Sequence, residues 1–154
     1  MTIDTGVNTL NINQATDRAV INWDNFSIQS GETTNFFQPS SSSATLNRVT
    51  GNNLSEIHGN LNANGNVFLI NQNGIIVGES GVIQTGGFVG STHSLSNQEF
   101  LEGGSLRFAP GQEGGAIVNL GSISVTGGDV FLIADQVINE GNISAADGLS
   151  LIHI

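Results

Sequence analysis

The side chains that most often carry out catalysis or bind metals are few and scattered in this sequence. His58, His93 and His153 have no histidine or carboxylate three or four residues away in a pattern suited to a metal. The most closely spaced carboxylates, Glu99 and Glu102, lie in an irregular stretch. We therefore predict that the chain has no catalytic residue, no metal site and no cofactor.

Two glycine-rich stretches also lack the context that their chemistry requires. Gly127-Gly128-Asp129 is similar to one unit of a calcium-binding nonapeptide repeat, but calcium sites of that kind need stacked copies. Gly86-Gly87 lacks the strand, loop and helix of a phosphate-binding loop. A polysaccharide lyase or hydrolase would need several acids, and often cations, converging on one face. The sequence therefore favours a protein that is not an enzyme and has no small-molecule substrate.

The charge balance excludes two classes of partner. The 154 residues carry 13 acidic side chains and three cations, Arg18, Arg48 and Arg107, which gives a formal net charge of −10. Phosphate backbones and anionic lipid surfaces are bound by clustered Lys and Arg, so we expect no binding to nucleic acid or to acidic membranes. The start at Met1 has no basic and apolar signal pattern, so we expect an exported form to have had its signal removed.

Short apolar words recur along the chain at a nearly constant spacing. Val67-Phe-Leu-Ile70 returns as Val130-Phe-Leu-Ile133, 63 residues later, which we interpret as about three units of 21. Gly59 and Gly81 are 22 residues apart, and residues near the C-terminus repeat at a spacing of 20. The matched pairs at this spacing are Asn119 with Asn139, Gly121 with Gly141 and Ile123 with Ile143.

These words predict strands of three to four residues, each bounded by Gly, Asn or Asp. Such short strands are stable when each coil of a solenoid pairs with the next one. Asn and Gly suit the corners, where stacked Asn side chains can form amide ladders. We predict a single all-β domain over 1–154, with a cap and first coil in 1–50, coils over 51–154 and an excursion near 93–115.

The expected core alternates along each strand, so neighbouring residues cannot all face inward. Trp23 and Phe26 are expected to pack in the cap rather than to form a platform for sugars. The residues predicted to include inward-facing side chains are Leu61, Val67, Leu69, Ile83, Ile123, Phe131, Leu132 and Ile143.

Residues 20–92 contain a series of words that resembles the N-terminal secretion domain of two-partner secretion exoproteins, the filamentous haemagglutinin family. The series includes Val20-Ile-Asn-Trp-Asp-Asn-Phe-Ser-Ile28, Ala44-Thr-Leu-Asn-Arg-Val-Thr-Gly51 and Ile57-His-Gly-Asn-Leu61. It continues with Ala63-Asn-Gly-Asn-Val-Phe-Leu-Ile-Asn-Gln-Asn-Gly-Ile75 and closes with Gly86-Gly-Phe-Val-Gly-Ser-Thr92.

The resemblance implies a right-handed parallel β-helix with an N-terminal β cap and extra-helical strands. It implies the secretion-signal domain of a large adhesin that leaves a Gram-negative cell through the periplasm and is secreted or stays at the surface. Its partner would be an outer-membrane β-barrel transporter with POTRA domains, and the domain would nucleate β-helix folding outside. We expect the domain to be a monomer.

Two words are candidates for transporter recognition, or for turns that make the fold recognisable. Where the family usually has Asn-Pro-Asn-Gly, this chain has Gln in place of Pro, and we expect the turn to survive because Asn-Gly is a strong turn signal. For the Asn-Arg word we expect the guanidinium to bond to stacked carbonyls. In both words we favour the structural role. The candidates are Asn47, Arg48, Asn71, Gln72, Asn73, Gly74 and Ile75.

The alternative function is a β-helical adhesive module that binds host glycans or surfaces directly. A module of that kind should expose a row of aromatic side chains along one face of the coils. Most aromatic residues of this sequence instead occupy core-like positions within the expected strands.

Overall fold

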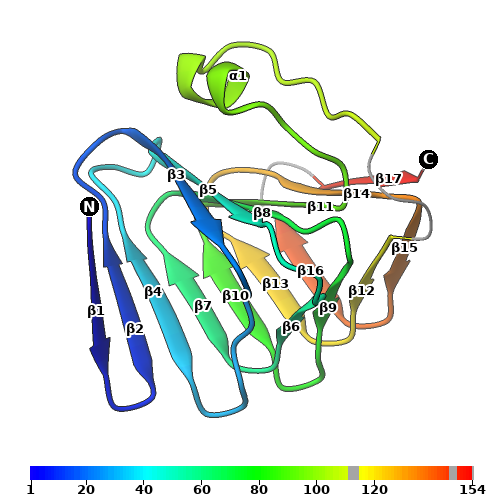
Figure 1. Ribbon diagram of the computed structural model, residues 1–154. Helices are drawn as coiled ribbons and strands as arrows, with labels where there is room; N and C mark the ends of the chain where they lie inside the picture. Colours follow the sequence, from blue (N-terminus) through cyan, green and yellow to red (C-terminus); the bar gives the residue numbers. More distant parts are fainter. Residues whose placement is uncertain (111–114, 146–148, 154) are drawn as a thin grey trace.

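The computed structural model describes residues 1–110, 115–145 and 149–153, with the backbone alone for the last of these ranges. The chain is 53% strand and 4% helix and forms a β-solenoid of about six turns (Figure 1). The predicted class, a right-handed parallel β-helix, is confirmed.

Three sheets run along the part of the solenoid that is described. The first has the order β1-β2-β4-β7-β10-β13-β16, the second β17-β14-β11-β8-β5-β3 and the third β15-β12-β9-β6. The first sheet contains β1 (Thr2–Gly6), β2 (Thr9–Asn13), β4 (Thr33–Phe37), β7 (Asn60–Ala63), β10 (Val82–Thr85), β13 (Ser122–Val125) and β16 (Asn142–Ala145). The second contains β3 (Arg18–Trp23), β5 (Ala44–Val49), β8 (Asn66–Ile70), β11 (Gly87–Ser91), β14 (Val130–Ala134) and β17 (Leu149–His153). The third contains β6 (Ser55–Ile57), β9 (Ile75–Val77), β12 (Ala116–Asn119) and β15 (Gln136–Asn139).

Parallel register places equivalent residues of successive coils on top of one another. Leu61 pairs with Ile83, Ile83 with Ile123 and Ile123 with Ile143. Because side chains alternate between the two faces of a strand, this register keeps one apolar row inside along the whole axis. The 20- and 22-residue spacings in the sequence are the lengths of single coils.

The 63-residue spacing, in contrast, does not correspond to three coils. Val67 pairs with Phe88, and Phe88 pairs with Val130, so the two matching words lie two coils apart. The remaining length leaves the solenoid between β11 and β12, where the chain forms α1 (Asn97–Glu102). We call residues 92–110 the strap; residues 111–114 of the expected excursion lie outside the described residues. The sequence count was wrong because the strap is about as long as one repeat.

The solenoid begins near the N-terminus. β1 lies antiparallel to β2 at the edge of the first sheet, whereas β2 and β4 already pair in parallel. β3 and β5 also pair in parallel in the second sheet. Residues 1–50 therefore contain the strand β1 and the first two strands of each of two coils.

Most of the expected core residues face the interior. Leu61, Val67, Leu69, Ile83, Ile123 and Leu132 are buried, and the half-buried Ile143 packs against the same cluster. Phe131 lies next to Leu132 on β14, so it points to the opposite face of the strand, where it is half-buried. A second cluster covers that outer face where the strap packs on it, and it contains Ala44, Leu46, Phe68, Ile70, Leu95 and Phe100.

Amide side chains of successive coils bond to one another in the described ranges, as predicted, for example from Asn53 Nδ2 to Asn25 Oδ1 at 2.9 Å. The Asn35 side chain donates to Asn11 Oδ1, and the Asn62 side chain donates to Asn35 Oδ1, both at 3.0 Å. At the end of the third sheet, Asn119 donates to Asn139 Oδ1, also at 3.0 Å. Each ladder satisfies polar groups between coils without using a charge.

Leu69→Ala should lower the free energy of unfolding by about 2–4 kcal/mol, because the side chain is fully buried and its removal leaves a cavity. Urea denaturation measures the loss. Leu101→Ala is the control: this leucine of α1 is 50% exposed, and its change should stay within about 0.5 kcal/mol. Equal losses in the two variants would contradict the inward orientation of Leu69.

Candidate functional site

The word at residues 71–75 forms a turn between β8 and β9 that is anchored by the amide of Asn71. Asn71 is fully buried, and its Nδ2 donates to Asn53 O and to Ser55 Oγ, both at 3.0 Å. Its Oδ1 accepts from the backbone N–H of Asn73 at 2.9 Å and from Asn73 Nδ2 at 3.0 Å. The amide of Asn71 therefore fills its full hydrogen-bonding capacity within the fold.

The rest of the word completes the same turn. Asn73 Nδ2 donates to Gly51 O at 2.9 Å, and the Gly74 N–H donates to Asn71 O at 3.1 Å. Gly74 has a φ of +124°, which favours glycine, and a Cβ there would lie 3.1 Å from Ala116 O. Ile75 is buried at the start of β9. The expected turn is present, and its loss of proline is tolerated because Asn and Gly supply the bonds and the backbone angle.

Gln72 differs from the other members of the word. Its side chain is partly exposed, and its amide makes no hydrogen bond to any residue in the described ranges. It is therefore the member of the word whose side chain is available to another molecule.

Asn47 of the second word joins three coils. The side chain is fully buried; its Oδ1 accepts from Trp23 Nε1 at 2.9 Å, and its Nδ2 donates to Phe68 O at 3.2 Å. Trp23 also packs edge-on against the buried Phe26, with the ring centroids 5.4 Å apart. Asn47 and the two aromatic rings thus hold the first coils together.

Arg48 holds the strap instead of a stack of coil carbonyls. Its Nη2 donates to Leu95 O, and its Nη1 donates to Asn97 Oδ1 and, at 3.5 Å, to Asn22 Oδ1. Partial burial removes water from the guanidinium and lowers the pKa of Arg48 from its ordinary value. The expectation of stacked carbonyls was wrong because the strap folds back over β5 and presents its own carbonyl there.

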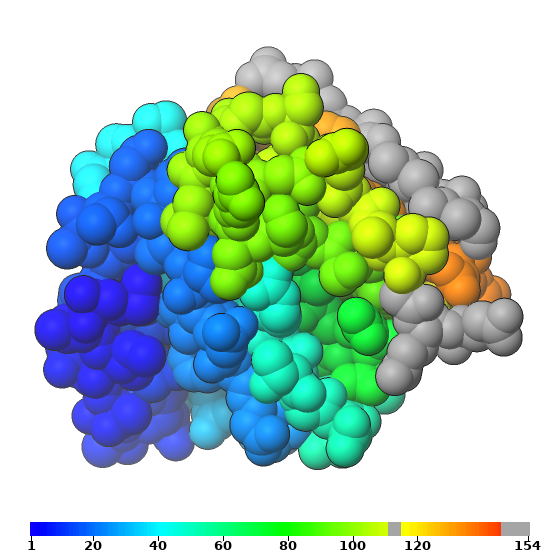
Figure 2. Space-filling model, turned by 45° about the horizontal axis from the view of Figure 1, so that its top comes forward, coloured from blue at the N-terminus to red at the C-terminus, as the bar shows by residue number. Residues whose placement is uncertain are grey.

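A second arginine holds α1, in the middle of the strap. Arg18 Nε donates to Phe100 O at 2.5 Å, and the guanidinium carbon lies 4.4 Å from the centroid of the Phe100 ring. Phe100 also packs edge-on against Phe68 at 5.1 Å. α1 lies over the strands of the second sheet (Figure 1), and the strap, in yellow-green, crosses blue and teal residues of the first coils (Figure 2).

The two words come together in one polar cleft of about 300 Å³ between the coil corner and the start of the strap. We call it the corner cleft. Arg48 and Gln72 lie on its wall, and no Asp or Glu is among its lining residues in the described part of the chain. Asn52 and Ser94, which help to complete it, were not singled out from the sequence, because nothing in their local pattern distinguishes them from other corner residues. The lining is Arg48, Val49, Thr50, Gly51, Asn52, Ile70, Gln72, Asn73 and Ser94.

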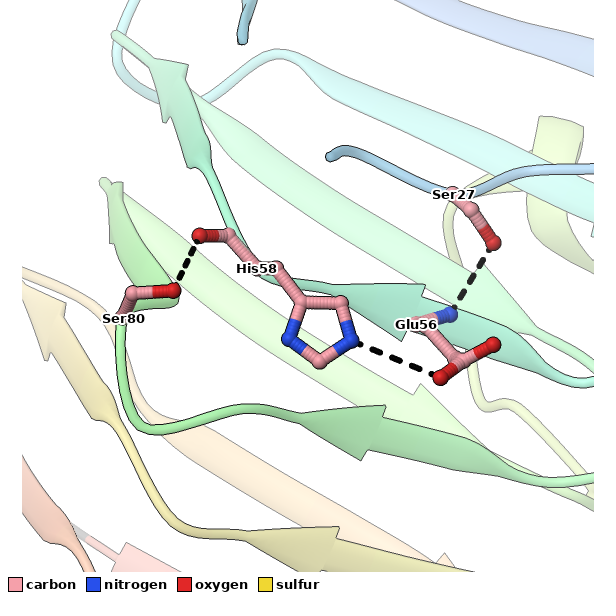
Figure 3. A network of polar contacts seen from close by, with 4 residues as sticks. All are labelled: Ser27, Glu56, His58 and Ser80. Atoms are coloured by element: carbon pink, nitrogen blue, oxygen red, sulfur yellow. Dashed lines mark hydrogen bonds and ion pairs between the residues drawn. The ribbon is translucent and has the colours of Figure 1, made fainter. Parts of the chain in front are cut away.

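Other polar side chains hold coils together rather than forming a reactive group. Ser80 Oγ donates to the backbone carbonyl of His58 at 2.7 Å, and Ser27 Oγ accepts from the Glu56 N–H at 3.0 Å (Figure 3). The His58 ring contacts Glu56 at 3.4 Å in an exposed position. His93 is buried, with Nε2 3.3 Å from Asp135 Oδ1. Within the described ranges, no three His, Asp or Glu side chains gather in a way that could hold a metal ion.

Comparison with known families assigns the chain. The model of the family described as the TPS secretion domain matches residues 1–153. This chain belongs to the TPS secretion domain family. The predicted resemblance to a two-partner secretion domain is thereby confirmed.

Solved and curated relatives agree with this assignment. The crystal structure of the HMW1 secretion domain from Haemophilus influenzae superposes with a TM-score of 0.92 and 38% identity, over 99% of this chain and 41% of that chain. A heme/hemopexin-binding protein of Haemophilus influenzae is 36% identical over 146 residues, which is 91% of this chain and 16% of that protein. This TPS domain therefore spans less than a fifth of the length of that curated relative.

The described part of the surface shows few exposed aromatic side chains. Phe37, at 52% exposure, is the one aromatic side chain among the large exposed hydrophobic residues of the described ranges. A row of stacked aromatic rings is thus missing from the described coils. Nor does the described part of the chain contain a helix of the length and apolarity needed to span a membrane.

Proposed function

We propose that this TPS domain is the secretion signal of a large exported protein, an adhesin, and that an outer-membrane transporter with periplasmic POTRA domains recognises it. Membership of the TPS secretion domain family carries the proposal. The corner cleft supports it, because residues from two of the motifs that carry the family resemblance, Arg48 from one and Gln72 and Asn73 from the other, line that cleft. The domain acts as a binding and folding module, not as an enzyme.

The architecture suits passage across a membrane followed by refolding. The chain has no cysteine, so no disulfide would obstruct an extended chain in a pore. Its strands are short and pair mainly with the next coil, so folding can proceed one coil at a time without an external energy source. The finished coils would then provide the template on which later parts of the exported chain fold at the cell surface.

The N-terminal edge offers a second contact for the transporter. β1 is exposed along its whole length and has a partner on one side, β2. An exposed strand edge can pair with a strand of another protein. We therefore assign β1 to strand addition with the periplasmic part of the transporter, and the corner cleft to recognition by side chains.

Export through the cognate transporter tests the proposed function. The domain would be directed to the periplasm by a signal peptide and expressed with or without the transporter that is encoded alongside its exoprotein. We expect the domain in the medium when the transporter is present and in the periplasm when it is absent, as measured by immunoblotting. Equal amounts in the medium under both conditions would contradict the proposal.

A further inference from the structure

We infer that the corner cleft binds a carboxylate side chain of the transporter, and that Gln72 and Arg48 are the residues that bind this carboxylate. The inference rests on the proposed function and names the chemistry of its contact. It assigns recognition to Gln72, and leaves Asn71 and Asn73 as the scaffold that holds Gln72 in place.

Among the side-chain amides of residues 71–75, that of Gln72 is the one without a hydrogen-bond partner in the described ranges. The amides of Asn71 and Asn73 bond to each other and to the corner at residues 51–55. The Gln72 amide bonds to no described residue and lines the cleft. Its NH₂ group is therefore free to donate to an acceptor that enters the cleft.

Arg48 supplies a positive charge without a paired acid. A guanidinium has five N–H donors, and the bonds of Arg48 to Leu95, Asn97 and Asn22 use three of them. In the described ranges no carboxylate lies within ion-pair distance of Arg48. The chain as a whole has a net charge of −10. The corner cleft nevertheless offers an incoming carboxylate the positive charge of Arg48, and its described lining contains no Asp or Glu.

Residues that line the cleft also carry backbone N–H groups without a partner in the described part of the chain. The N–H groups of Gly51, Asn52 and Gln72 donate to no group in the described part of the chain. A site with one guanidinium, free amides and free N–H groups offers donors and charge to a carboxylate, the acceptor that such groups bind best. An ammonium group would meet the Arg48 charge, so a basic partner side chain is excluded from this position.

The test uses the purified domain and the purified periplasmic domains of the cognate transporter. We expect Gln72→Ala to raise the dissociation constant of the complex by about tenfold. Gln72→Glu should raise it further, because a carboxylate at this position repels the incoming carboxylate and pairs with Arg48. The thermal midpoint of Gln72→Ala should not change, since the Gln72 amide has no hydrogen-bond partner in the described part of the fold, and that of Gln72→Glu should not fall, since the new carboxylate pairs with Arg48. Gln84→Ala, which removes an exposed amide from β10 that does not line the cleft, should bind as the wild type does.

Three results would overturn the inference. Wild-type affinity in both Gln72 variants would place recognition elsewhere, and the proposed function would stand as long as the wild-type domain binds the transporter. Binding by Gln72→Glu that equals or exceeds the wild type, with weaker binding by Gln72→Ala, would exclude a carboxylate as the ligand. Self-association that Gln72→Ala abolishes, with transporter binding unchanged, would show that a second copy of the chain fills the cleft.

Discussion

Gly121→Ala should destabilise the domain by about 1–3 kcal/mol or more, since an added methyl group would be driven into neighbouring backbone. A Cβ on Gly121 would lie 2.3 Å from Gly78 O and 2.4 Å from Gly81 O. Those carbonyls are fixed, because Gly78 O accepts from Gly81 N at 2.9 Å and Gly81 O accepts from Ser122 N at 3.0 Å. The methyl group can therefore be accommodated only by separating two coils.

The same contact recurs at four successive coils, before β7, β10, β13 and β16, where the glycines form a column along the corner that precedes the first sheet. A Cβ would lie 2.2 Å from a backbone oxygen at Gly59, at Gly81 and at Gly141. Gly127→Ala is the matched control, since a Cβ there has nothing within 4 Å and should change stability little. Urea denaturation of both variants gives the comparison, and a Gly121 variant as stable as the Gly127 variant would show that the coils can move apart cheaply.

Replacing Asn71 and Asn73 together by alanine should abolish export and lower the free energy of unfolding by about 2–4 kcal/mol. Asn71 is fully buried, so its loss leaves Ser55 Oγ, Asn53 O and the Asn73 N–H without the partners that the fold gives them. Because the turn joins β8 to β9, its loss also releases the wall of the corner cleft. The loss of export is then a consequence of a broken turn.

Two measurements on that double variant separate structure from recognition. The thermal midpoint should fall by several degrees, whereas Asn60→Ala, which removes an exposed amide from β7, should keep both stability and export. A variant with wild-type stability that is not exported would show that Asn71 and Asn73 are themselves the epitope. Normal export of the double variant through its own transporter would contradict both explanations.

The regular part of the fold follows from local pattern. Each coil contacts the coil before and after it, so a recurring word such as Gly59-Asn-Leu61 and its counterpart at Gly81 marks residues that must stack in register. Asn-Gly at residues 73–74 predicted a turn because its backbone requirements are satisfied within a few residues, and the turn is present. The family words, read in order along residues 20–92, were enough to identify the secretion domain.

The corner cleft depends on contacts that no local pattern contains. Arg48 meets the strap 47 and 49 residues further along the chain, and Arg18 meets it after 82 residues. The sequence predicted an excursion near 93–115, but it did not show where this segment docks, and so it did not predict that Arg48 bonds to the strap. The burial of an apolar outer face, on Leu46 and Phe68, decides where the strap docks.

Repeat spacing and turn residues thus determined the solenoid, because those interactions are short-range and repeated. Tertiary packing alone decided which side chains, Gln72 foremost, remain free at its surface.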